Sequence, residues 1–157
     1  MSEVDANREI LRERIKQAGY VGERDWAHRM PLVPYHEYFA PGITRGAIGN
    51  SRILELGLPN FLAMLQAIHQ SSDVSDLLIE IDDNFDLGWP EWDYAFVSTS
   101  QDIDAVRGWF GTAAPDQILP AGRNGPWVKA RTIRLEEIKV APNHQLWALR
   151  WAKDIDE

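Results

Sequence analysis

Cysteine is absent from the 157-residue sequence, so the chain forms no disulfide bond and has no thiolate for metal binding or nucleophilic catalysis. Long apolar runs are also absent, because no stretch approaches the roughly 20 residues that cross a bilayer as a helix. Residues Met1 to Asp5 are polar and acidic, without the apolar segment that is typical of a secretion signal. These absences lead us to expect a cytoplasmic protein.

Basic residues are missing from the middle third of the chain, because no Lys or Arg occurs between Ile53 and Val106. Residues 1–52 carry eight basic and seven acidic side chains, and residues 107–157 carry eight and six, so the whole net charge of −8 comes from the middle third. An acidic surface disfavours binding to nucleic acid and to anionic lipid, and it favours a basic protein partner. The eleven acidic residues of this third are Glu55, Asp73, Asp76, Glu80, Asp82, Asp83, Asp86, Glu91, Asp93, Asp102 and Asp104.

Length and composition fit a single globular domain over residues 1–157. The hydrophobic fraction of 45% and the charged fraction of 25% are ordinary for such a domain. A domain of this size buries about two thirds of its unfolded surface, so it needs no disulfide or metal to be stable. We expect an N-terminal helix within residues 1–19 and a frayed acidic tail at residues 153–157.

Helical spacing of apolar residues marks three segments, at residues 3–18, 58–70 and 103–110. Pro59 suits the first turn of the second helix. We expect Ser100 to be the N-cap of the third helix, since serine is a favoured residue at that position.

Alternation of apolar and polar residues predicts strands at residues 77–81, 93–99 and 145–152. The first two are separated by a turn, which indicates an antiparallel hairpin. A weaker strand, interrupted by glycine, is predicted from Ala47 to Leu54.

From residue 46 onward the predicted order is strand, helix, strand, strand, helix, strand. This order predicts an α+β fold in which an antiparallel sheet has helices packed on one face. It is also the order of a ferredoxin-like split βαβ fold, which is the more specific alternative. The N-terminal helix is additional to either arrangement.

The predicted hairpin turn, residues 82–93, concentrates acidic side chains around two tryptophans. Its first residues resemble a calcium loop, but Leu87 stands where that loop needs glycine, and Asp93 stands where it needs a bidentate glutamate. A solvated acidic turn and a protein-binding surface are therefore better interpretations than a calcium loop, which stays open as the least favoured. The tryptophans favour a protein-binding surface because they are enriched at interfaces. The predicted partner-binding residues are Asp82, Asp83, Asp86, Trp89, Glu91, Trp92 and Asp93.

Catalytic motifs are missing, because the four histidines match no metal-binding spacing and no Gly-x-Ser-x-Gly nucleophile elbow occurs. We therefore expect no catalytic residue, no cofactor and no metal. The alternative that stays open is an enzyme or small-molecule-binding protein. Its pocket would lie between the sheet and the loop of residues 111–144, with His144 or Arg123 as polar groups.

Five segments stand out between Pro31 and about Pro120: Pro31–Pro34 with Tyr38-Phe39, Gly46–Asn50, Asp73–Ile81, Trp89–Asp93 and Val106–Phe110. Together they resemble a group of small uncharacterised bacterial proteins, over a little more than half of the chain. Proteins of that group have no assigned activity, so the resemblance implies no catalytic residue.

The sequence thus predicts a non-enzymatic binding domain that engages a basic protein partner through its acidic surface. The most concrete version is a bacterial immunity protein that neutralises a toxin. Binding to nucleic acid or to a membrane is not expected, and a homodimer stays open.

Overall fold

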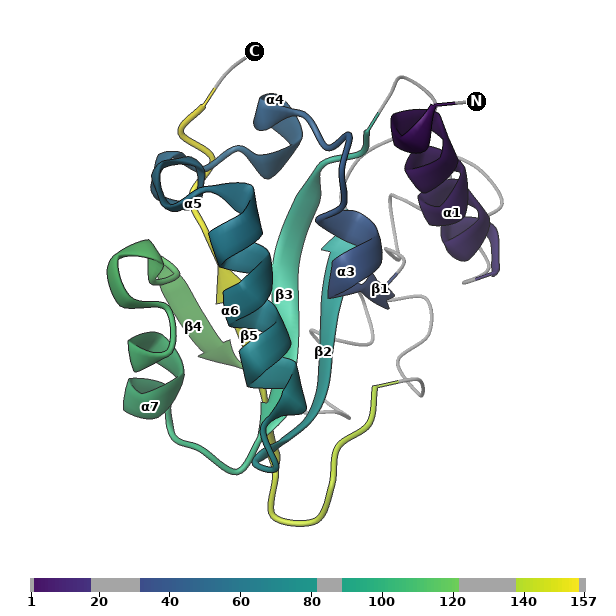
Figure 1. Cartoon of the computed structure of the whole chain (residues 1–157). Helices are drawn as coiled ribbons and strands as arrows, with labels where there is room; N and C mark the ends of the chain where they lie inside the picture. Colours follow the sequence, from purple (N-terminus) through teal and green to yellow (C-terminus); the bar gives the residue numbers. More distant parts are fainter. Residues whose placement is uncertain (1, 18–31, 82–88, 122–137, 156–157) are drawn as a thin grey trace.

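The computed structural model describes residues 2–17, 32–81, 89–121 and 138–155. Its centre is a five-stranded antiparallel sheet with the order β1-β2-β3-β5-β4, shown in Figure 1. The predicted α+β fold with an antiparallel sheet is therefore confirmed. The strands are β1 (Leu32–Pro34), β2 (Val74–Ile81), β3 (Trp92–Thr99), β4 (Gln117–Pro120) and β5 (Gln145–Arg150).

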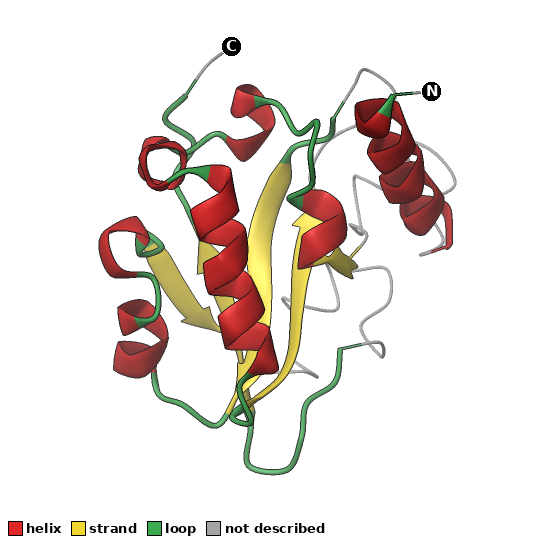
Figure 2. Cartoon of the chain, in the orientation of Figure 1, coloured by secondary structure: helices red, strands yellow, loops and turns green. Residues whose placement is uncertain are grey.

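Helices gather in front of one face of the sheet, with α6 lying across its middle and α1 to one side, as Figure 2 shows. The three predicted helices are all present, at α1, α6 and α7. The helices are α1 (Glu3–Gln17), α3 (Tyr35–Tyr38), α4 (Arg45–Ile48), α5 (Ser51–Leu56), α6 (Leu58–Gln70), α7 (Ile103–Gly108) and the 3-10 turn η2 (Gly111–Ala113).

The main core lies between α6 and the sheet. The helical spacing of Phe61, Leu65 and Ile68 puts these side chains on one face of α6, where all three are buried. Alternate residues of β2, including Leu77 and Ile79, are buried in the same cluster. Burial of this apolar surface is the main favourable term that holds the helices on the sheet.

A second, smaller core covers the other face of the sheet. Phe96 of β3 points away from Ala95 and Val97, because successive side chains of a strand alternate between faces. Within the described residues, the side chains that pack on this face come from strands and loops and not from helices. The cluster consists of Leu32, Phe96, Ala121, Ile138, Leu146 and Ala148.

The strand predicted from Ala47 to Leu54 is wrong, because this segment forms the two short helices α4 and α5. Asn50 separates them and is the N-cap of α5, where its side-chain oxygen accepts hydrogen bonds from the N–H groups of Arg52 and Ile53. Gly49, with φ of +71°, ends α4 in the left-handed conformation. The capping residues Gly49 and Asn50 therefore outweigh the weak apolar alternation on which the predicted strand was based.

The ferredoxin-like alternative is also wrong. In a split βαβ unit the two strands joined by a helix lie parallel, with another strand between them. Here α6 follows β1 and precedes β2, and these two strands are direct antiparallel neighbours. The sheet instead grows outward from the β2–β3 hairpin that the sequence predicted.

The N-cap of α7 is Asp102 rather than the predicted Ser100. The Asp102 carboxylate accepts a hydrogen bond of 2.9 Å from the N–H of Ala105. Its negative charge also suits the positive end of the helix.

Residues Ala152 to Ile155, which we call the strap, dock on the fold instead of fraying as predicted. The Asn50 side-chain amide donates to the carbonyl of Ala152 at 2.8 Å, and the N–H of Asp154 donates to the carbonyl of Gly49 at 2.8 Å. The Asp154 carboxylate accepts from both the N–H and the hydroxyl of Ser51, at 2.7 and 2.8 Å. The strap is therefore part of the folded structure.

We expect Phe61→Ala to lower the free energy of unfolding by about 3–5 kcal/mol, the range for removing a large aromatic side chain from a core. Phe61 is 1% exposed and packs against the rings of Phe39 and Trp151 at centroid distances of 5.3 and 5.8 Å. Urea denaturation measures the loss. The exposed Gln66→Ala on the same helix is the control, with a change within about 0.5 kcal/mol. Equal losses in the two variants would contradict this core.

The strap gives the protein an acid-sensitive contact. Hydrogen bonds from the hydroxyl and the N–H of Ser51 lower the pKa of the Asp154 carboxyl. A lowered pKa stabilises the fold fully above the ordinary aspartate pKa of 3.8, and this contribution disappears as the pH falls through the folded-state pKa. We expect Asp154→Asn to lower the urea midpoint at pH 7, and the difference from wild type to shrink below pH 3.8. A difference that is constant down to pH 2 would contradict this contact.

Candidate functional site

The predicted partner-binding residues follow β2 and lead into β3. Asp82, Asp83 and Asp86 lie outside the described residues, as does the segment tested for calcium binding up to residue 88. The described part of the site runs from Trp89 to Asp93.

Three hydrogen bonds hold the segment from Trp89 to Trp92 against the helices. The Trp89 indole N–H donates to the carbonyl of Tyr38 at 3.0 Å, and the Tyr38 hydroxyl donates to the carbonyl of Pro90 at 2.7 Å. The Trp92 indole N–H donates to the carbonyl of Ile48 at 3.0 Å. Since each of these donors is a ring or phenol with little rotamer freedom, the segment is held in one conformation.

Trp92 is a core residue, which corrects the prediction that it contacts a partner. Its side chain is 0% exposed and packs against Phe39 and Trp151 at centroid distances of 5.1 and 5.4 Å. The Lys153 ammonium lies 4.5 Å from the centre of the indole ring. Trp89 is only half-buried, so part of its ring reaches the surface. The structure thus separates two tryptophans that the sequence treated alike.

The charge of Asp93 is balanced by a basic residue from another strand. The pairing of β2 with β3 shifts by one residue near Asp93, and the Asp93 carboxylate lies 3.3 Å from Nε of Arg150 on β5. The Asp93 side chain is only 13% exposed. Glu91, two residues earlier, is exposed to solvent. Glu91 is therefore the predicted acid that the described segment presents at its surface.

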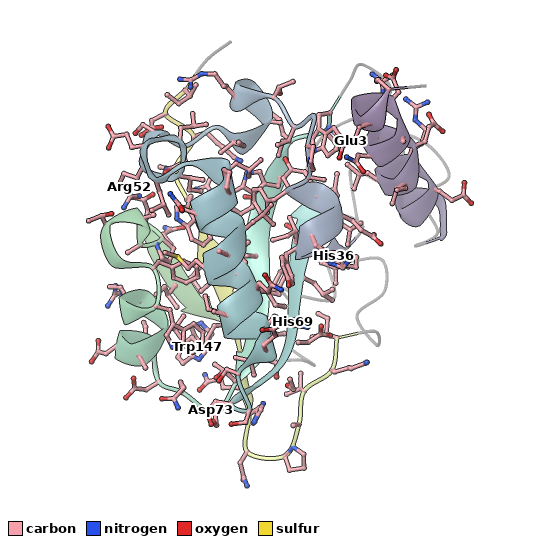
Figure 3. The ribbon with its side chains drawn as sticks, viewed as in Figure 1. Glu3, His36, Arg52, His69, Asp73 and Trp147 are labelled. Atoms are coloured by element: carbon pink, nitrogen blue, oxygen red, sulfur yellow. The ribbon has the colours of Figure 1, made fainter. Side chains whose placement is uncertain are left out.

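The described acids of the middle third lie at both ends of β2. β2 has eight residues and is about 26 Å long, so its two ends lie on opposite sides of the molecule. Asp73 and Asp76 lie at its start, and Figure 3 places Asp73 at the foot of the molecule. Glu80, near the other end of the strand, is 0% exposed. Glu91 is the exposed acid among the described residues near this end.

His144, the polar group of the enzyme alternative, lies against Ser75 in β2. The Ser75 Oγ atom is 3.0 Å from His144 Nδ1, 2.6 Å from the Ser98 hydroxyl and 2.8 Å from the carbonyl of Lys139. The Ser75 hydroxyl has one hydrogen. Because the carbonyl oxygen of Lys139 can only accept, the Ser75 hydroxyl donates its hydrogen to that oxygen. His144 then donates from Nδ1, a tautomer assigned from the network.

This arrangement makes Ser75 a structural connection. Its oxygen also receives the N–H of Ala141 at 3.4 Å, so it ties the chain around residues 139–144 to the sheet. An oxygen engaged in this way is not poised to attack a substrate. Arg123, the other polar group of the enzyme alternative, lies outside the described residues.

A cavity of about 290 Å³ lies between α1 and α3, away from the place predicted for a ligand pocket. This volume is at the low end of the range for small-molecule sites. It is lined by Asn7, Ile10, His36, Glu37 and Ala40. Within residues 2–17, 32–81, 89–121 and 138–155, no three His, Asp or Glu side chains cluster in a way that could hold a metal ion.

A family model matches residues 6–149, from the first turn of α1 to the residue before the end of β5. The chain belongs to the uncharacterized YfbO family. This match confirms the resemblance to a group of uncharacterised proteins. No curated protein and no solved structure matches the chain.

The matched YfbO range includes α3, α4, β2 and β3, which surround the Trp89–Asp93 segment, whereas Arg150, Trp151 and the strap follow the matched range. The described helices of this family member include none with the length and apolar character needed to cross a membrane.

Sequence reasoning missed two features of the site. The Arg150–Asp93 ion pair joins residues 57 positions apart, and no local pattern reports such a distance. The strap was interpreted as a frayed tail because its composition is polar, although Asp154 is the residue that makes its strongest contacts.

We expect Trp92→Phe to lower the free energy of unfolding by about 1–3 kcal/mol, because it leaves the buried carbonyl of Ile48 without its donor. Trp89→Phe removes a comparable N–H, but from a half-buried ring rather than a fully buried one, so its effect should be smaller. Thermal denaturation of the two variants measures the difference. A larger effect of Trp89→Phe would contradict the assignment of Trp92 to the core.

Proposed function

We propose that this member of the YfbO family is a non-enzymatic protein-binding domain that engages a basic partner through the turn end of the β2–β3 hairpin. Its most concrete form is a bacterial immunity protein that neutralises a toxin in the cytoplasm. The observation that carries the proposal is the exposed Glu91, held on a segment with three side-chain hydrogen bonds. In the sequence this segment directly follows Asp82, Asp83 and Asp86.

Rigidity of the segment supports binding. A side chain on a fixed backbone loses less conformational entropy when a partner docks, so more of its interaction energy appears as affinity. The half-buried Trp89 next to Glu91 adds a large amphipathic ring of the kind enriched at interfaces.

Charge supports a basic partner. The segment from Ile53 to Val106 contributes acids and no Lys or Arg, and the nearby Arg150 is already paired with Asp93. A surface of one sign raises the association rate with an oppositely charged protein by 10-fold or more, and salt weakens this effect.

The edges of the sheet favour contact through side chains. β1 has three residues and β4 has four, and each includes a proline, Pro34 or Pro120, that lacks a backbone N–H. Short edge strands with proline are poor templates for an added strand. Recognition through the turn end of the hairpin therefore suits this sheet better than strand addition does.

We expect the triple reversal Asp82→Lys, Asp83→Lys and Asp86→Lys to reduce partner affinity by at least about tenfold, because it replaces attraction with repulsion. The partner is first captured with the wild-type protein as bait, then purified, and its affinity is measured by titration calorimetry at two salt concentrations. Circular dichroism checks that the variant is folded. Unchanged affinity would remove the turn as the binding site.

A second triple reversal with the same change in net charge is the matched control: Glu13→Lys, Glu55→Lys and Asp104→Lys, all at exposed carboxylates on helices. Its effect on partner affinity should be much smaller than that of the reversal at the turn. Equal losses in both triple variants would show a dependence on net charge and contradict a defined site at the turn.

The immunity version adds a growth test. Co-expression of the captured partner with the wild-type protein should restore growth that the partner alone inhibits. A partner that is harmless when expressed alone would contradict the toxin-neutralising role while leaving protein binding intact.

The alternative function, an enzyme or small-molecule-binding protein, draws on the position of His144. Its Nδ1 is bound to Ser75, which leaves Nε2 as the nitrogen available to a ligand. A metabolite retained by the purified protein and released on unfolding, lost in His144→Ala, would favour this function.

A further inference from the structure

We infer that the strap, residues Ala152 to Ile155, controls the order of the proposed binding segment through the turn at Ile48 to Ser51. The strap and the Trp89–Asp93 segment touch this turn from two sides. Its consequence for partner binding rests on the proposed function, whereas the coupling itself does not.

The first residue of the turn binds the Trp89–Asp93 segment, and the next three bind the strap. The carbonyl of Ile48 accepts the indole N–H of Trp92, and the carbonyl of the next residue, Gly49, accepts the N–H groups of Asp154 and Ile155 at 2.8 and 3.3 Å. Because these two carbonyls belong to consecutive residues, we expect a displacement of the backbone at Gly49 to carry the carbonyl of Ile48 with it. A displaced strap therefore shifts the acceptor of Trp92.

Asn50 and Ser51 of the turn also form hydrogen bonds with the strap. Asn50 is 0% exposed and holds the Ala152 carbonyl, while Ser51 gives two hydrogen bonds to the Asp154 carboxylate. Hydrogen bonds to a charged group are stronger than those between neutral groups. Asp154 is thus the strap residue whose side chain accepts two hydrogen bonds from the turn.

Lys153 makes the second link, because it lies directly over Trp92. Its ammonium is 4.5 Å from the indole centre, and its Cδ atom would stand 2.7 Å from a Cβ at position 49. The absence of a side chain at Gly49 therefore leaves room for the Lys153 side chain. Figure 1 shows the yellow C-terminal segment running beside α4 and α5, the helices that flank this turn.

Closure of the strap thus keeps Trp92 covered and its N–H bonded. Trp92 is the first residue of β3 and directly follows the exposed Glu91. Opening of the strap loosens the anchor of Glu91 without touching any residue that would contact a partner.

Hydrogen exchange at the indole N–H groups tests this coupling. In Asp154→Ala the exchange of the Trp92 indole N–H should accelerate by about tenfold, the size expected for losing charge-assisted hydrogen bonds. The indole of Trp147, which donates to Gln101 at the far end of the sheet, is the internal reference and should keep its rate. Both signals are followed by nuclear magnetic resonance in the same sample.

Asp104→Ala is the matched control, because it removes the same chemical group from a side chain on α7 that is 89% exposed. It should change neither indole. The milder variant Ser51→Ala, which removes one hydrogen bond to Asp154, should give a smaller acceleration at Trp92 alone.

Unchanged exchange at Trp92 in both Asp154→Ala and Ser51→Ala would overturn the coupling. Equal acceleration at Trp92 and Trp147 in both variants would also overturn it. Failure of the proposed function gives a different pattern. In that case the triple reversal at the turn leaves partner affinity intact, while Asp154→Ala still accelerates exchange at Trp92.

Discussion

The burial of two indole rings with satisfied N–H groups constrains the rest of this structure. Trp92 and Trp151 are 0% and 1% exposed, and their ring centroids lie 5.4 Å apart. A buried indole N–H without an acceptor is costly, so each ring needs a carbonyl from another segment. The acceptors are Ile48 for Trp92 and Ala113 for Trp151, the latter at 2.8 Å. This requirement fixes α4 and η2 against the sheet, and Phe39, Phe61 and Phe110 fill the remaining space.

The same constraint shapes the surface. Because Trp92 is anchored, the adjacent Glu91 is held at the start of β3, and Asp93 is directed toward Arg150. The acidic middle third, continuous in the sequence, is divided by the length of β2 into groups at opposite ends of the hairpin. Its net charge is a property of the chain, but the charge that a partner meets depends on which end it approaches.

Local patterns predicted the elements with long, regular periodicity. α6, the β2–β3 hairpin and β5 follow from apolar spacing, and the N-terminal helix from its amphipathic stripe. The strand at residues 47–54 failed because two helices of four and six residues are too short for periodicity to reveal, although Gly49 and Asn50 are the residues expected at a helix end and start. The place of β1 in the sheet could not be predicted, since strand order depends on contacts between distant residues.

The sequence by itself determined the fold class, the absence of thiol chemistry and the excess of acids in the middle third, because composition and short-range periodicity express these properties directly. Only the tertiary structure decided that Trp89 reaches the surface while Trp92 does not, that Arg150 balances Asp93, and that Asp154 holds the chain after β5 to Ser51. Each of these outcomes depends on a contact between residues at least 44 positions apart, and such contacts exist only after the sheet has brought its strands together.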